Sequence, residues 1–221
     1  MSLLHDFTAR YSSSEAWLYD HFIAPAVMDL GETVVDEYLG LLPHGAEVLE
    51  VGCGGGQFAR SQLDKREDLR WTGLDVSAEQ IARARRRNAR HAGATFIVGD
   101  ALKLPFPDAR FDALTSIASI KHWPDPAKGL SECVRVLRPG GELMVVEADR
   151  GCRLEDAWSF VARWRLPALA RPINLLLFRT LVAGRSLDLD DARALLSDLP
   201  LSTWDVTRLR GTPAILLRAR R

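Results

Sequence analysis

A glycine-rich turn between an apolar run and an amphipathic stretch is the strongest constraint on how this chain folds. In AEVLEVGCGGGQFAR, residues 46–60, a short apolar run leads into the glycine loop, residues 52–56. Glycine lets the backbone turn sharply and approach a neighbour that leaves no room for a Cβ. Between a buried strand and a helix, such a turn places N–H groups against a ligand at the carboxyl end of a sheet. A purely structural turn stays open as the alternative.

Short apolar runs alternate with amphipathic stretches along most of the chain. This pattern predicts an α/β fold, a doubly wound and mostly parallel sheet flanked by helices. Seven segments are predicted as strands: 47–51, 70–75, 95–99, 111–117, 141–148, 203–209 and 214–218. The carboxyl ends of the parallel strands meet at one edge, where we expect the functional residues.

The 221 residues suit a single domain, since domains commonly hold roughly 100–200 residues. Four parts are predicted: a helical cap over 1–40, a ligand-binding core over 41–150, a helical insert over 151–186, and a C-terminal helix with two strands over 187–221. The apolar, arginine-dotted insert interrupts the alternation after the fifth strand, and its prolines Pro167 and Pro172 predict two helical pieces.

The overall charge argues against a nucleic-acid partner. Lys plus Arg and Asp plus Glu number 29 each, so no net field attracts phosphate backbones. The three cysteines are scattered, with no spacing typical of a zinc site or a disulfide framework, so we expect no metal and a cytoplasmic setting. The sequence shows no signal-peptide pattern and no apolar run of about 18 residues, so we expect no stable membrane insertion.

Acidic residues follow the next two predicted strands. Asp75 ends the second strand, about 20 residues beyond the loop, a spacing at which a carboxylate accepts hydrogen bonds from ribose hydroxyls. Helix capping is the alternative role for this residue. Asp100 follows the third strand at the same edge, where it can orient an adenine amino group.

Several motifs, in this order, make the chain resemble the class I S-adenosylmethionine-dependent methyltransferases. They are VLEVGCGGGQFA, GLDVSAEQI, FIVGDALKLPFPDARFDALTS and HWPDPAKGLSECVRVLRPGGELMVVE, within about residues 45–150. The resemblance is closest to the small-molecule group that includes the ubiquinone and menaquinone biosynthesis methyltransferases. It implies a Rossmann-like sheet of seven strands, S-adenosylmethionine as cofactor, and a small-molecule acceptor.

The resemblance also implies which residues bind the cofactor. Asp75 would bind the ribose hydroxyls, and the Ile117 backbone would lie near the methionine amine. The remaining implied contacts are Gly52, Cys53, Gly54 and Gly56 at the methionine and ribose, Val76 and Gln80 flanking the adenine, and Asp100 with Ala101 at its amino edge. Cys53 and Gln80 stand where the family varies. A nicotinamide dehydrogenase on the same sheet is the enzyme alternative, but the loop lacks the usual GxGxxG spacing.

Three residues are candidates for catalysis. Methyl transfer from a sulfonium needs alignment and exclusion of water, and a base only if the acceptor arrives protonated. His122, after the fourth strand, is the first candidate base, with fixing the loop as the alternative role. Glu147 ends the fifth strand on the acceptor side, and Tyr19 in the cap could reach the cofactor or the acceptor, with core packing as its alternative.

The insert is predicted to serve as a lid over an apolar or aromatic acceptor. Its aromatic and leucine side chains suit the wall of an apolar pocket. The same face could instead form a homodimer contact, rest on an anionic membrane surface, or pack into the core. A methyltransferase-like module that binds the cofactor without turnover stays open as the alternative function.

Overall fold

The computed structural model describes residues 24–221, and Tyr19 and the rest of residues 1–23 lie outside the described part. Its centre is a seven-stranded sheet in the order β3-β2-β1-β4-β5-β7-β6. The strands are β1 (Glu47–Val51), β2 (Arg70–Asp75), β3 (Ala94–Val98), β4 (Phe111–Ile117), β5 (Leu137–Ala148), β6 (Thr203–Arg208) and β7 (Ala214–Arg220). Neighbours from β3 to β5 pair in parallel, whereas β7 runs antiparallel to both β5 and β6. The predicted doubly wound, mostly parallel α/β fold is confirmed.

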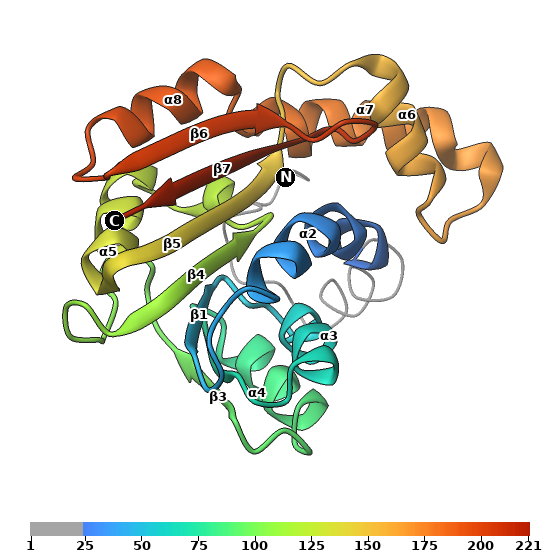
Figure 1. Cartoon of the computed structure of the whole chain (residues 1–221). Helices are drawn as coiled ribbons and strands as arrows, with labels where there is room; N and C mark the ends of the chain where they lie inside the picture. Colours follow the sequence, from blue (N-terminus) through green and yellow to red (C-terminus); the bar gives the residue numbers. More distant parts are fainter. Residues whose placement is uncertain (1–23) are drawn as a thin grey trace, which may run out of the picture.

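Helices cover both faces of the sheet (Figure 1). They are α2 (Ala24–Leu39), α3 (Gln57–Lys65), α4 (Ala78–Arg87), α5 (Pro126–Val136) and α8 (Leu189–Ser197). Because strand side chains alternate between faces, Met144 and Val146 of β5 join one core with α2, α3 and α4. Leu143 and Val145 join a second core with α5 and α8. The sheet is therefore buried on both sides, and its edges and strand ends are left for function.

Local capping explains where the helices begin. Ser77 accepts a hydrogen bond from Gln80 N at the start of α4, and Asp125 caps α5, which has proline in its first turn. Asp188 and Asp191 form a reciprocal capping box at the start of α8. The helical character predicted for the cap agrees with the structure over residues 24–39.

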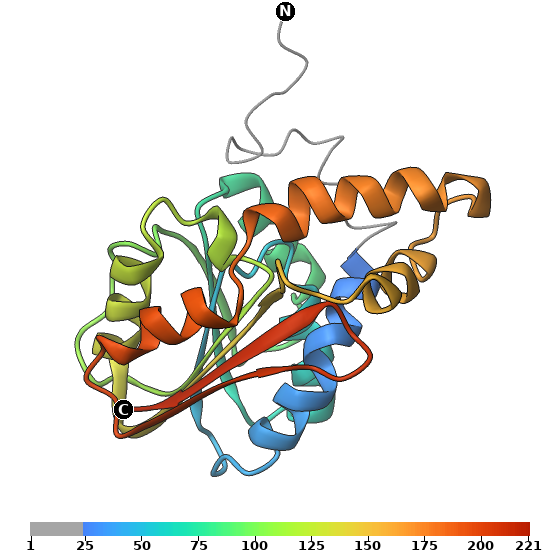
Figure 2. The same cartoon turned by 90° about the horizontal axis from the view of Figure 1, so that it is seen from above.

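The insert after β5 contains α6 (Leu154–Ala162) and a longer run made of η3 (Ala168–Ala170), α7 (Arg171–Leu177), η4 (Phe178–Val182) and η5 (Ala183–Arg185). Figure 2 shows this run projecting beyond the sheet. Phe160, Trp164 and Phe178 pack together, with ring centroids 5.1–6.3 Å apart. Pro172 lies in the first turn of α7, where its missing N–H costs nothing, so it starts this helix instead of dividing it.

Four strands differ in their bounds from those predicted, and one of them is β6, which ends at Arg208 instead of Leu209. β3 begins and ends one residue earlier, at Ala94 and Val98, while β5 begins at Leu137 instead of Gly141 and β7 continues to Arg220. The last two shifts have one cause, because Gly140 N donates to Arg221 O at 2.8 Å and Arg221 N donates to Gly141 O at 3.0 Å. This pairing joins residues 80 positions apart, which local patterns do not report.

Candidate active site at the carboxyl edge of the sheet

The glycine loop is tied to β2 by backbone hydrogen bonds. Gly52 N and Cys53 N both donate to Leu74 O, at 2.7 and 3.0 Å. Gly52, Gly54 and Gly56 have φ of 77°, 50° and 70°, a region that side chains disfavour. The turn at the end of β1 is therefore held in place by protein contacts as well as by glycine.

The three predicted glycines are needed for different reasons. A Cβ on Gly52 would lie 1.9 Å from Ser119 Oγ, and one on Gly56 would lie 2.8 Å from Ala84 Cβ. A Cβ on Gly54 would meet no atom within 4 Å. At Gly52 and Gly56 the neighbour that leaves no room for a Cβ is therefore the protein itself and not a ligand. Open space lies beside Gly54.

Asp75 lies beside the loop, as predicted. Its Oδ2 accepts from Gly54 N and its Oδ1 from Ser77 N, both at 2.9 Å. Burial raises the pKa of this carboxyl, while the two N–H donors oppose the rise. A carboxylate offers about four acceptor positions, so these two bonds leave acceptor capacity on both oxygens.

The residues that follow Asp75 present an apolar surface and an unsatisfied oxygen. The Val76 side chain is 69% exposed, which is unusual for valine. Gln80 is buried, and its Oε1 has no hydrogen-bond partner among the described residues. An unsatisfied buried acceptor is costly, and the described residues supply no donor for this oxygen.

The predicted contacts after β3 and β4 lie at the same edge. Asp100 is exposed, and its Oδ1 accepts from Leu102 N at 2.8 Å, which fixes the turn. Ala101 is buried beneath this turn. Ile117 ends β4 next to Ala118, whose φ of 54° is rare for a residue with a Cβ.

Cys53 faces inward. Its side chain is buried under the loop, and a Cβ on Gly73 would lie 2.9 Å from Cys53 Sγ. Burial raises the pKa of this thiol well above its ordinary value. Its N–H already donates to Leu74 O, so a cofactor contact from Cys53, which stays a prediction, would be limited to its carbonyl and Cα.

Glu147 forms a buried ion pair with Lys121. Lys121 Nζ lies 2.9 Å from Glu147 Oε1, with side-chain exposures of 8% and 0%. The same oxygen accepts from Ala148 N at 2.8 Å, and Lys121 N lies 3.3 Å from Oε2. Lys121 Nζ also donates to Ala118 O at 2.7 Å. The catalytic role predicted for Glu147 stays a prediction, and these contacts favour holding the turn after β4.

His122 closes the short helical turn η2 (Ile120–His122). Burial and the adjacent Lys121 lower its pKa to about 4, against the opposing effect of Glu147. The imidazole is therefore neutral at pH 7. It can accept a hydrogen bond or a proton, but it is a weaker base than an ordinary histidine.

Glu50, which precedes the loop, is a buried acid. Its Oε2 accepts from Trp71 Nε1 at 3.0 Å, and burial raises its pKa to about 8. The carboxyl consequently holds its proton at neutral pH, which suits a group with no cationic partner in the described part of the chain.

Sequence reasoning missed the residues that support the loop. Ser119 packs on Gly52 and accepts from Trp123 Nε1 at 3.1 Å. Asn88 is buried and donates to Gly56 O at 2.9 Å. Lys121 could have been noticed in the sequence, because it is a cation within an otherwise apolar run. The partners of Asn88 and Ser119 are too distant in sequence to be inferred.

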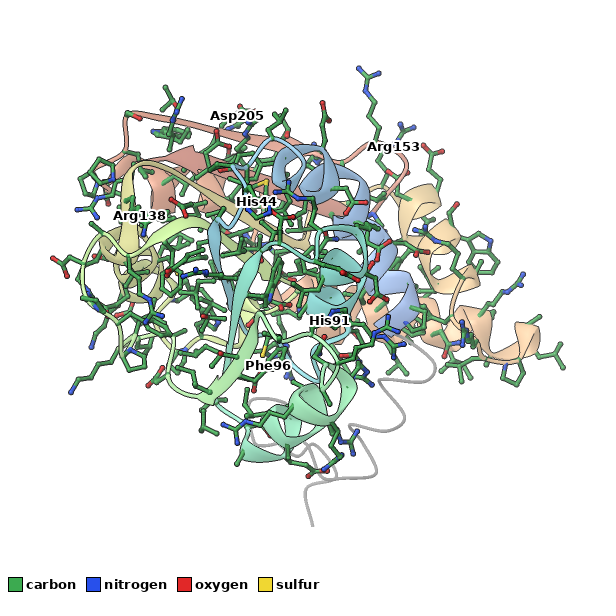
Figure 3. All side chains as sticks on the ribbon, turned by 60° about the horizontal axis from the view of Figure 1, so that its bottom comes forward. His44, His91, Phe96, Arg138, Arg153 and Asp205 are labelled. Carbon is green, nitrogen blue, oxygen red and sulfur yellow. The ribbon has the colours of Figure 1, made fainter. Side chains whose placement is uncertain are left out.

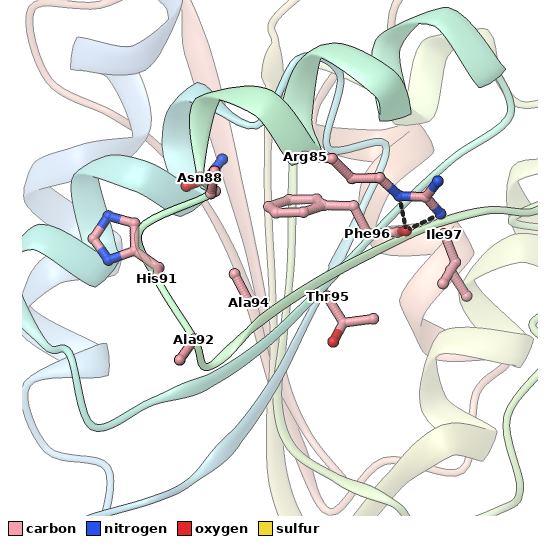
Figure 4. Close-up of a pocket in the computed structure, with 9 residues that line it drawn as sticks. Arg85, Asn88, His91, Ala92, Ala94, Thr95, Phe96 and Ile97 are labelled. Atoms are coloured by element: carbon pink, nitrogen blue, oxygen red, sulfur yellow. Dashed lines mark hydrogen bonds between the residues drawn. The ribbon is translucent and has the colours of Figure 1, made fainter.

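A pocket separate from this edge lies at the other end of the sheet. It has a volume of about 460 Å³ and is formed by the end of α4 and the amino half of β3 (Figure 4). Arg85 donates from Nε and Nη2 to Phe96 O there, at 3.0 and 2.7 Å. The Arg85 guanidinium is thus engaged by the protein, and the glycine loop lies at the opposite ends of the strands. This pocket is therefore not the site built around Asp75.

Residues 24–221 contain neither a candidate metal centre nor a candidate membrane-spanning helix. No group of three or more His, Cys, Asp or Glu there could hold a metal ion. None of the helices in that range combines the length and the apolar character needed to cross a bilayer.

Comparison with known proteins agrees with this geometry. A family profile described as a methyltransferase domain matches residues 49–145. An O-methyltransferase of Aspergillus nomiae is 31% identical over 176 residues, covering 77% of this chain and 71% of that protein. The 2-methyl-6-phytyl-1,4-hydroquinone methyltransferase of Synechocystis sp. is 40% identical over 109 residues, covering 49% of this chain and 34% of that protein.

The matches differ in how much of each protein they cover. The chain spans only 34–38% of the length of the first three curated relatives. A putative S-adenosyl-L-methionine-dependent methyltransferase of Methanococcus maripaludis has the same fold, with a TM-score of 0.74, 16% identity, and coverage of 100% of this chain and 97% of that one. With the glycine loop and Asp75 in place, the chain belongs to the class I S-adenosylmethionine-dependent methyltransferases.

Proposed function

We propose that this chain transfers the methyl group of S-adenosylmethionine to a small molecule at the carboxyl edge of its sheet. The observation that carries the proposal is the Asp75 carboxylate, which is held by Gly54 N and Ser77 N and keeps acceptor capacity on both oxygens. A ribose diol offers two hydroxyl donors that match it. A structural turn before α4, whose N-cap is Ser77, would explain the bond from Ser77 but not the one from the glycine loop.

The other predicted contacts fit the same cofactor. The open space beside Gly54 leaves room next to the carboxylate, and exposed Val76 offers an apolar surface for an adenine ring. Gln80 Oε1 would gain a donor from an amino group. Cofactor roles for Asp100, Ala101 and Ile117 belong to this proposal as well.

The bound cofactor would supply an activated methyl group on a sulfonium, so the protein needs to align the acceptor and exclude water. His122, neutral at pH 7, would orient the acceptor by a hydrogen bond and take up a proton only from an acidic one. Glu147, with both oxygens engaged, would act as a positioning residue that holds Lys121 and the turn after β4.

We propose that the acceptor is apolar or aromatic. The Synechocystis relative is named for a hydroquinone that carries a phytyl chain, which is aromatic and apolar. In this chain α6, the first helix of the insert, starts six residues after β5 ends, so the insert would border the predicted acceptor side of the edge. The rings of Phe160, Trp164 and Phe178 are buried against one another. They would support from behind the side of the insert that faces the acceptor.

Labelled S-adenosylmethionine and a metabolite extract test the function. The wild-type chain should transfer label to an apolar extract component, and Asp75→Ala should lose both cofactor binding and transfer. Asp205→Ala, at an exposed position of β6, is the matched control and should behave as wild type. Tight cofactor binding without transfer to any component would instead support the inactive binding module.

A further inference from the structure

The outer face of the insert exposes large apolar side chains. Leu169 is 95% exposed, Ile173 and Leu176 are each 62% exposed, and Leu177 is 44% exposed. At the helical period, positions 173, 176 and 177 lie on one side of α7. The opposite side is occupied by buried Asn174 and Phe178, which pack toward the core. The exposed leucines and isoleucine are therefore not needed to hold the insert in place.

The insert carries charge of one sign only after α6, which itself contains Glu155 and Asp156. Residues 163–187 contain five arginines and no Asp, Glu or Lys, although the whole chain has 29 basic and 29 acidic residues. Arg165, Arg179 and Arg185 are exposed. A cationic segment with exposed apolar side chains, on a chain with no net charge, is the combination that binds anionic lipid headgroups.

The insert stands clear of the sheet. Figures 1 and 2 show α7 and its continuation extending past the strands, and Figure 3 shows Arg153, near the start of the insert, far from Arg138. A flat surface can therefore approach the insert without meeting the helices that cover the sheet.

We propose that this outer face docks peripherally on an anionic phospholipid bilayer. Leu169, Ile173 and Leu176 would enter the boundary between headgroups and acyl chains, and the arginines would pair with lipid phosphates. A two-fold homodimer through the same face fits less well, because it would bring the arginines of each copy against those of the other. The proposal goes beyond methyl transfer and does not depend on it, since docking is measured without cofactor.

Cosedimentation with vesicles tests the proposal. The full chain should bind phosphatidylcholine vesicles that contain about one third phosphatidylglycerol, and should stay in solution with phosphatidylcholine alone. Binding should weaken steeply as salt rises, because the Debye length falls from about 10 Å at 0.1 M to about 3 Å at 1 M. Equal binding to both vesicles, or none to either, would overturn the proposal.

Variants locate the surface. Arg165→Gln and Arg179→Gln should each weaken binding about fivefold, the effect expected for one arginine near an anionic membrane. Ile173→Glu should abolish it. Matched controls are Arg86→Gln on α4 and Leu41→Glu after α2, both at exposed positions, and these should bind as wild type. The proposal fails if the test and control variants lose binding equally. It also fails if the wild-type chain is a dimer that binds no vesicles and Ile173→Glu dissociates this dimer.

Discussion

Two carboxylates end strands at the same edge of the sheet, and their surroundings differ. Asp75, at the end of β2, is partly exposed and accepts two backbone N–H bonds, one for each oxygen. Glu147, near the end of β5, is completely buried and pairs with Lys121 and two backbone N–H groups. The first carboxylate is accessible and keeps capacity for a ligand, whereas the second is buried and paired with a cation of the protein.

This difference divides the edge into an open half, on the β1–β2 side, and a closed half, on the β4–β5 side. On the β1–β2 side, open space beside Gly54 and the unsatisfied Gln80 Oε1 suit a bound molecule. On the β4–β5 side, the Lys121–Glu147 pair fixes the turn that carries Ser119 and His122. A carboxylate at a strand end is therefore a sign of the functional edge. Only its hydrogen-bond and charge partners indicate whether it can bind a ligand or holds the protein's own structure in place.

The largest expected effect comes from the closed half. Lys121→Met would leave Glu147 buried without its cation, a change that costs about 3–5 kcal/mol of unfolding free energy. The double variant Lys121→Met, Glu147→Gln should recover much of this loss, because the remaining side chain is neutral. Urea denaturation measures both. A loss below about 1 kcal/mol for the single variant would mean that the pair is not as buried as the structure shows.

Two alanine substitutions in the glycine loop should separate stability from binding. Gly52→Ala forces a Cβ into Ser119, so we expect a loss of about 1–3 kcal/mol in unfolding free energy in addition to the strain at positive φ. Gly54→Ala meets no atom and should cost only about 1–2 kcal/mol for its φ of 50°. The two variants should differ in the opposite sense in binding. Relative to the stability that each variant loses, calorimetry should show a larger loss of S-adenosylmethionine affinity for Gly54→Ala than for Gly52→Ala.

A second substitution checks the origin of the Gly52 effect. Adding Ser119→Gly to Gly52→Ala removes the clashing atoms and should restore part of the stability. If the double variant is no more stable than Gly52→Ala, the close approach of Ser119 is not the reason for glycine at this position.

A smaller effect follows from the histidine of the closed half. The folded pKa of His122, about 4, lies below its unfolded value, so the unfolded chain binds the proton more readily between these values. The stability from neutral His122 is full above pH 6.5 and falls as the pH approaches 4. Between pH 7 and pH 5, wild type should lose about 2 kcal/mol more than His122→Gln.

The comparison with the variant is needed because Glu50 acts in the opposite direction. Its raised pKa, about 8, makes its contribution fall as the pH rises from about 4.5. Turnover should also show no inflection from His122 between pH 6 and 7. Matching pH profiles of stability for wild type and His122→Gln would contradict the buried, neutral imidazole.

Local patterns predicted the open half of the edge well. The bounds of β1 and β2 agree with the expected runs, and Asp75 lies at the edge where its spacing from the glycine loop predicted it. Strand alternation and turn chemistry are properties of neighbouring residues, so the sequence reports them directly.

The closed half could not be derived in this way. Lys121 and Glu147 are 26 positions apart, and only the pairing of β4 with β5 brings them together. The early start of β5 depends likewise on Arg221 at the end of the chain. Sequence predicted Glu147 at the correct edge but not the ion pair that engages it.

A structure of the chain with S-adenosylhomocysteine tests the central claim most directly. The account predicts both ribose hydroxyls within hydrogen-bond distance of the Asp75 carboxylate, with the adenine against Val76 and near Gln80 Oε1. A ligand bound elsewhere, or one whose ribose is held by other residues while Asp75 contacts only Gly54 and Ser77, would contradict it.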